Sequence, residues 1–194
     1  TYMDGTTDIT RTYPLGPLTE DEKRFYTWTL QSHIDLAKAV WLDYCECKMI
    51  DTIAREPLWR HLINYRCGTG HSVSFVGNVH EGPHALNSRN TTRMRPGMVV
   101  TDEPGVYETD LVGIRIENEL VCVHKADNQY GTFLGFEPLT FVPIATSPIL
   151  PGVLDKDEIA WLNDYHRQVF AKLAPHLNDE ERSWLAEKCA AIGC

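Results

Sequence analysis

The segment Gly113-Ile-Arg-Ile-Glu-Asn-Glu119 indicates how the middle of this chain folds. Branched apolar residues alternate with charged ones, so an extended strand places Arg115, Glu117 and Glu119 on one face and the isoleucines on the other. The charged face is either solvated or lines a site. Gly and Pro residues punctuate further β-rich runs on both sides, and we expect strands over residues 98–101, 111–124 and 132–142 that form a sheet.

Helical patterns flank this expected sheet. Thr19-Glu-Asp-Glu22 is a capping box and predicts the start of a helix. Its buried face is predicted from the apolar residues Tyr26, Leu30, Ile34, Ala37 and Trp41. A second helix is predicted over residues 48–62, interrupted near Pro57, whose ring disfavours helix at the preceding residue. Two more are predicted after a Pro-rich connector, with caps near Asp155 and Asn178.

The composition excludes several classes of protein. With 194 residues, 43% of them hydrophobic, the chain can bury a core of its own. A formal net charge of −9 and the lack of a basic stripe argue against a nucleic-acid partner. No apolar run approaches the ~20 residues of a membrane span, so we expect no membrane partner and a cytoplasmic location. The six cysteines are irregularly spaced and are expected to be reduced thiols, while Cys45-Glu-Cys47 leaves open half of a thiolate metal site.

Four separate segments carry the residue types of a metal site: Asp8, His71, Glu103 and Glu117. Three carboxylates and one imidazole suit manganese, cobalt or iron, with zinc possible. Without a cation, converging carboxylates would repel one another by roughly 4 kcal/mol per pair at about 4 Å and an effective dielectric near 20. Each residue also has an ordinary interpretation: an acidic turn for Glu103, a solvated strand face for Glu117, and a hydrogen-bonding histidine for His71.

Five motifs, in this order along the chain, resemble those of the Xaa-Pro aminopeptidases, metallopeptidases with the pita-bread fold. The motifs are Asp4-Gly-Thr-Thr-Asp-Ile-Thr-Arg-Thr12, Gly68-Thr-Gly-His71, Asn78-Val-His-Glu-Gly-Pro83, Val100-Thr-Asp-Glu-Pro-Gly105 and Gly113-Ile-Arg-Ile-Glu-Asn118. The resemblance implies an α/β (α+β) domain over residues 1–146, with a curved antiparallel sheet flanked by helices. Residues 147–194 would form a helical extension.

The resemblance also implies the roles of particular residues. Asp8 and Glu117 would bridge two divalent metal ions, most often Mn²⁺ with Zn²⁺ or Co²⁺ as alternatives, and His71 and Glu103 would complete the ligands of one ion. Glu103 would also serve as the general base toward the attacking water. His80 would contact the substrate near the scissile bond, and Arg115 would support the site and the substrate. The expected substrate is a peptide with proline in second position, and the expected assembly is a homodimer formed through the catalytic and C-terminal regions.

The chain departs from the family pattern in three ways. The family's upstream histidine near the active site, and the one or two amino-terminal domains that close its substrate groove, are not in this sequence. The family's first Asp ligand would lie four residues before Thr1, so we expect an amino-terminally truncated domain that holds one ion and is inactive alone. Cys67 stands where the family often has a histidine, and it is either a pocket residue or a soft metal contact. Two alternatives are a non-catalytic peptide-binding protein of the same fold and a metal-free hydrolase of the creatinase kind.

Overall fold

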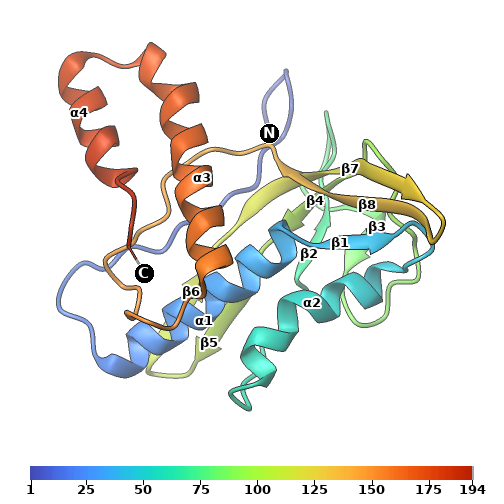
Figure 1. The fold of residues 1–194 in the computed structure, drawn as a ribbon, viewed down its shortest axis with the longest axis horizontal. Helices are drawn as coiled ribbons and strands as arrows, with labels where there is room; N and C mark the ends of the chain where they lie inside the picture. Colours follow the sequence, from blue (N-terminus) through green and yellow to red (C-terminus); the bar gives the residue numbers. More distant parts are fainter. Residues whose placement is uncertain (194) are drawn as a thin grey trace.

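The computed structural model describes residues 1–193 as a mixed arrangement of helices and antiparallel strands (Figure 1). The helices are α1 (Glu20–Ala37), α2 (Cys47–Trp59), α3 (Lys156–Leu173), the short 3-10 helix η1 (Ala174–His176) and α4 (Asp179–Lys188). The strands are β1 (Val40–Leu42), β2 (Gly70–Ser72), β3 (Glu81–Leu86), β4 (Val99–Asp102), β5 (Gly105–Glu108), β6 (Val112–Arg115), β7 (Asn118–Asn128) and β8 (Gly131–Pro138).

The central sheet has four antiparallel strands in the order β1-β8-β7-β4. Two smaller antiparallel pairs, β2-β3 and β5-β6, accompany it. Figure 1 shows β7 and β8 as a long curved ribbon pair with α1 and α2 lying across the sheet. A cluster of buried side chains from α2, β4, β7 and β8 fills the space between these helices and the sheet. The predicted sheet and its flanking helices are therefore present.

Helix α1 begins where the sequence predicts. The Thr19 hydroxyl accepts from the amide of Glu22, and the Glu22 carboxylate accepts from the amide of Thr19, which completes the capping box. The helix ends at Ala37, so the assignment of Trp41 to its buried face was wrong. Trp41 is buried from strand β1 and its ring lies 4.5 Å from that of Phe136.

Two other boundaries differ from the sequence prediction. Helix α2 continues through Pro57 and ends at Trp59. Because the proline lies in the last turn, its missing amide donor and its ring affect only the end of the helix. The run predicted as one strand over residues 111–124 is two strands, β6 and β7, separated at Ile116 and Glu117. The alternation of side chains continues across this break. Ile114 and Ile116 are buried in one apolar cluster, and Glu117 is not part of that cluster. The strand predicted over 132–142 ends at Pro138.

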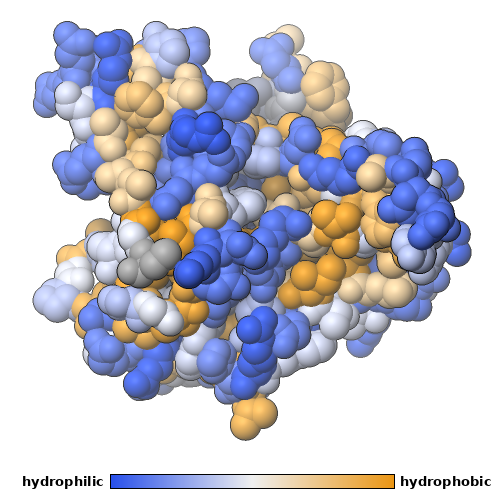
Figure 2. Space-filling model, viewed as in Figure 1, coloured by the Kyte–Doolittle hydropathy of each residue, from blue (hydrophilic) through white to orange (hydrophobic). Residues whose placement is uncertain are grey.

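The C-terminal helices have the predicted caps, with Asp155 accepting from the amide of Glu158 and Asn178 from that of Glu181. Tyr165 of this segment is buried within the chain, in a cluster shared by α1, β6, α3 and α4. Trp184 remains 55% exposed. Figure 2 shows that this view of the surface is mostly hydrophilic, with an apolar patch beside the junction of α3 with α1.

Across residues 1–193, none of the helices combines the length and the apolar character that crossing a bilayer requires.

Candidate metal centre

Three of the four predicted ligands meet around one atom, Nε2 of His71. That nitrogen lies 3.1 Å from Oε1 of Glu103 and 3.5 Å from Oδ2 of Asp8. His71 belongs to β2, Glu103 directly follows β4, and Asp8 lies in the extended amino-terminal segment. Asp8 is itself held in place, because its amide donates to Oε1 of Glu119 at 2.6 Å. Segments distant in the sequence therefore bring two carboxylates to one imidazole.

Glu117, the fourth predicted ligand, lies between β6 and β7 and is only 1% exposed. Thr10 holds it twice: the Thr10 hydroxyl donates to Oε2 of Glu117, and the Glu117 amide donates to the Thr10 carbonyl at 3.0 Å. Oε1 of Glu117 is buried and has no hydrogen-bond partner among the described residues. Burial, with the nearby charges of Glu103 and Asp8, raises the pKa of Glu117 to about 7 despite the Thr10 bond.

Glu103 has the opposite electrostatic setting. Burial favours its neutral form, but the hydrogen bond from His71 and the cation of Arg115 outweigh burial and hold the pKa of Glu103 below its ordinary value. Nη1 of Arg115 lies 3.0 Å from Oε2 of Glu103, and the Thr101 hydroxyl donates to Oε1 at 3.0 Å. Glu103 is therefore an ionised carboxylate with both oxygens engaged.

His80, predicted to contact substrate, lies at the exposed side of this group. Its ring centroid is 4.1 Å from that of His71, and the two rings are inclined by 45°. Arg115 is half-buried, and its guanidinium lies 5.7 Å from the ring centroid of Tyr107. All five residues named from the sequence around Glu103 are thus on one side of the molecule, with His80 open to solvent.

Local sequence explains how His71 comes so close to β4. A Cβ on Gly70 would overlap the carbonyl oxygen of Thr101, so only glycine permits this approach of β2 to β4. The Thr101 hydroxyl accepts from the amide of His71 at 3.0 Å, and the Thr69 carbonyl accepts from the amide of Glu103 at 2.7 Å. These contacts fix the two ligand-bearing segments against each other.

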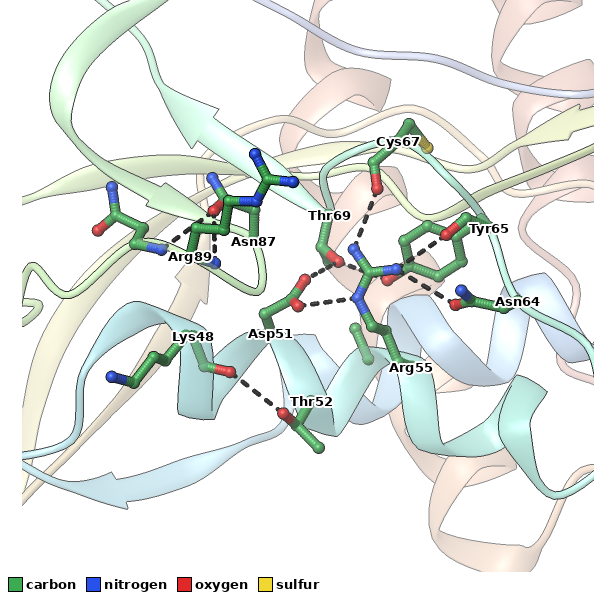
Figure 3. Close-up of polar contacts among 12 residues, drawn as sticks. Lys48, Asp51, Thr52, Arg55, Asn64, Tyr65, Cys67, Thr69, Asn87 and Arg89 are labelled. Carbon is green, nitrogen blue, oxygen red and sulfur yellow. Dashed lines mark hydrogen bonds and ion pairs between the residues drawn. The ribbon is translucent and has the colours of Figure 1, made fainter.

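The loop that enters β2 is anchored to helix α2 by a buried ion pair (Figure 3). Nε of Arg55 lies 2.8 Å from Oδ2 of Asp51, and its other nitrogens donate to the carbonyls of Tyr65 at 2.9 Å and Cys67 at 3.0 Å. Asp51 also accepts from the hydroxyl of Thr69. Because the loop continues directly into Gly70 and His71, this pair supports the placement of the imidazole.

Sequence reasoning did not single out Thr10, Thr101 or Glu119 as members of the site. Each lies two residues from a predicted ligand in the sequence. Their hydroxyl and carboxylate groups hold the predicted ligands Glu117, Glu103 and Asp8 respectively. The spacing of two residues, which places side chains on the same face of a strand, was the available signal.

The chemistry of these residues fits a divalent cation. The group combines three carboxylates with one imidazole, and a buried oxygen of Glu117 has no partner among the described residues. Within residues 1–193, no three His, Cys, Asp or Glu side chains are already spaced as a coordination sphere. His71 and the carboxylates instead pair with one another, and a cation would replace the proton shared between His71 and Glu103.

The cysteines among residues 1–193 do not converge in the same way. Cys45, Cys47, Cys67, Cys122 and Cys189 are free thiols, and Cys194 lies outside the described residues. Burial raises the pKa of Cys47 to about 11, which disfavours the thiolate that a metal needs. The thiol of Cys67 lies 3.8 Å from the carbonyl of Gly105.

Two family models match this chain. Residues 1–124 match the family model described as metallopeptidase family M24, and residues 132–192 match the model for the C-terminal region of peptidase M24. The chain belongs to metallopeptidase family M24. The resemblance seen in the sequence motifs is therefore confirmed at the level of the family.

Several individual proteins are similar to this chain. The chain is 41% identical over 198 residues to "Aminopeptidase P1" of Lotus japonicus and 44% identical over 191 residues to "Aminopeptidase P2" of Arabidopsis thaliana. Those matches cover 99% and 95% of this chain but only 30% and 27% of the relatives. Among solved structures, X-prolyl aminopeptidase of Caenorhabditis elegans, described as a cytosolic enzyme with a di-nuclear active site, matches with a TM-score of 0.92. It is 39% identical, and the match covers 98% of this chain and 32% of that one.

The fold prediction is confirmed by this structural match, which includes the C-terminal helices. The chain spans about a third of the length of the relatives that it matches.

Proposed function

We propose that this chain supplies the catalytic residues of a metal-dependent Xaa-Pro aminopeptidase, which hydrolyses the bond between an amino-terminal residue and a following proline. The observation that carries the proposal is the meeting of Asp8, His71 and Glu103 within 3.5 Å of one nitrogen atom, beside the buried Glu117. The names of the similar proteins support the choice of substrate.

The proposed ligands are Asp8, His71, Glu103 and Glu117, and the proposed ion is Mn²⁺, with Zn²⁺ or Co²⁺ as alternatives. A divalent cation bound there would polarise the peptide carbonyl and make the attacking water more acidic. These four groups are sufficient for one ion. Metal analysis of the purified chain after dialysis against Mn²⁺ is expected to find about one tightly held ion per chain, and no retained ion would contradict the ligand assignment.

Side chains of this chain would transfer the proton, orient the carboxylate and contact the substrate. Glu103 is ionised and buried, and in this proposal it accepts the proton of the attacking water and later gives it to the proline nitrogen. Arg115 keeps that carboxylate oriented through its contact with Oε2. His80 is exposed beside His71 and is free to donate a hydrogen bond to the substrate.

Glu103→Gln tests the role of the general base. The amide keeps the shape of the side chain but cannot accept the proton, and hydrolysis of an Xaa-Pro peptide by the complete enzyme, of which this chain is a part, is expected to fall by about 100-fold or more. The control is Glu137→Gln, a mostly exposed carboxylate on β8 away from the site. Activity of Glu103→Gln within tenfold of the parent would contradict the assignment, and loss of activity in both variants would point to a general defect.

We also propose that the enzyme is cytoplasmic and forms a homodimer through the catalytic region and the C-terminal helices. The cytosolic description of the Caenorhabditis elegans enzyme supports the location. The 55% exposure of Trp184 on α4 supports a contact surface there. Light scattering at about 20 µM is expected to give twice the mass of one chain, and Trp184→Glu is expected to shift the value toward a monomer. A monomeric parent chain would refute the dimer.

A further inference from the structure

The residues next to the proposed ligands Glu103 and Glu117 in the chain form a buried row on the opposite side of the strands. This row consists of Asp102, Asn118 and His33. Asp102 precedes Glu103 and Asn118 follows Glu117, and the two residues face each other in the register of β4 and β7. Both are fully buried. His33 of helix α1 joins them, with Nδ1 at 3.0 Å from Asp102 and Nε2 at 3.2 Å from the amide nitrogen of Asn118. Any shift of this row would move the carboxylates on the other side.

Helix α3 reaches this row with one hydroxyl group. Tyr165, 1% exposed, has its hydroxyl 3.1 Å from Oδ1 of Asn118, 2.7 Å from Nη2 of Arg11 and 3.2 Å from the amide of Val142. A hydroxyl has one proton and two lone pairs. Arg11 and the amide of Val142 can donate to the lone pairs, while the proton is within reach of Oδ1 of Asn118 and of the carbonyl of Thr140, each at 3.1 Å, so every bonding position of the hydroxyl is used.

Arg11 completes the connection to the proposed ligand Glu117. Nη1 of Arg11 donates to the carbonyl of Glu117 at 2.6 Å, and Nη2 donates to Oδ1 of Asn118 at 2.8 Å. The same guanidinium donates to the carbonyls of Thr10 and Val142 at 2.9 and 2.7 Å. Thr10 in turn bonds the Glu117 side chain. The backbone of Glu117 and the Thr10 residue that holds its side chain are thus both bonded to Arg11, and Arg11 is bonded to the Tyr165 hydroxyl.

We propose that Tyr165 is a positioning residue: through Arg11 and Asn118, its hydroxyl holds Glu117 in the orientation that binds the metal ion. The inference rests on the proposed metal site. It assigns a part of the site to α3, which lies outside the segment that carries the ligands. Groups that hydrogen-bond a metal ligand directly typically change metal affinity by about 10–100-fold when they are lost, and because Tyr165 acts one contact further back, we expect an effect near the lower end of that range.

Tyr165→Phe is the test variant, and Tyr26→Phe is its matched control. Both tyrosines are buried in the same apolar cluster, and each hydroxyl lies within hydrogen-bond distance of a backbone carbonyl. The Tyr26 hydroxyl donates only to the carbonyl of Ala145, at 2.7 Å. The Tyr165 ring would keep its stacking on Trp161 at 5.4 Å in the phenylalanine variant. The two substitutions therefore remove the same group, but only one of them touches the row behind Glu117.

The measurement is titration of each chain with Co²⁺, followed by visible absorption, together with thermal unfolding without metal. Tyr165→Phe is expected to bind Co²⁺ about tenfold or more weakly, with altered absorption bands, while Tyr26→Phe keeps the parent affinity and spectrum. Equal affinity and spectrum in Tyr165→Phe, or equal weakening in Tyr26→Phe, would overturn the proposal. A parent chain that binds no Co²⁺ would overturn the metal site and this inference together. If Tyr165→Phe does not fold, Arg11→Lys decides, and parent-like Co²⁺ affinity in it overturns the inference.

Discussion

The buried histidine of helix α3 makes the stability of the chain depend on pH. His166 is fully buried, and Nε2 accepts from the amide of Ile144 at 3.0 Å, which requires that nitrogen to be unprotonated. Burial, followed by the nearby Arg11 cation, lowers the pKa of His166 to about 4. The unfolded chain has an ordinary histidine pKa near 6.5. As the pH falls through this window, the unfolded state takes up a proton before the folded state does.

The sign and size of the effect follow from that difference. Because the unfolded state binds more protons between pH 6.5 and 4, the free energy of unfolding falls as the pH is lowered. The contribution of His166 is fully present above about pH 6.5, and about 2.5 kcal/mol of it is lost by about pH 4.5. Buried Asp102, whose pKa burial raises to about 6 despite the His33 contact, works in the opposite direction over part of the window.

His166→Gln isolates the histidine from the other titrating groups. The glutamine carbonyl can reach the position of Nε2 and accept from Ile144, but it does not titrate. Urea unfolding is measured for both chains at several values between about pH 7.5 and pH 4.5. The difference in unfolding free energy between parent and variant is expected to change by about 2.5 kcal/mol, with the parent losing stability at acid pH. A difference that stays constant within about 0.5 kcal/mol would refute this account of His166.

Two further outcomes are expected. Asp51→Ala should lower the free energy of unfolding by about 3–5 kcal/mol, because it leaves the guanidinium of Arg55, which is 8% exposed, without its counter-ion (Figure 3). Urea denaturation measures this, and a loss below about 1 kcal/mol would contradict it; Glu20→Ala, which breaks an exposed pair with Lys23, is the control and should cost about 0.5 kcal/mol or less. Added Mn²⁺ should stabilise the chain by about 2.7 kcal/mol when the free ion is at about 100 times its Kd. Thermal unfolding with and without a chelator checks this, and a melting temperature that does not respond to Mn²⁺ would count against the metal site.

Elements whose signals are local were predictable from the sequence. The caps at Thr19, Asp155 and Asn178 involve bonds between residues three positions apart, so the chain encodes them within a single turn. The alternation around Glu117 survived even where the strand breaks, because successive side chains point to opposite sides in any extended backbone. The motifs also named the residues that the structure brings together around His71, through a resemblance rather than through local physics.

The tertiary structure alone decided which groups touch. Thr10 and Glu117 are 107 positions apart, and Tyr165 meets Arg11 across 154 positions. No local pattern reports such contacts, because they depend on the path of the whole chain and on the core that closes those loops. For the same reason Trp41, predicted to lie on a helix face, is part of strand β1 in the structure. The sequence by itself determined the caps, the alternation and the candidate ligands. Packing of distant segments determined that the pKa of Glu103 is lowered, that the pKa of Glu117 is raised, and which groups hold each side chain in place.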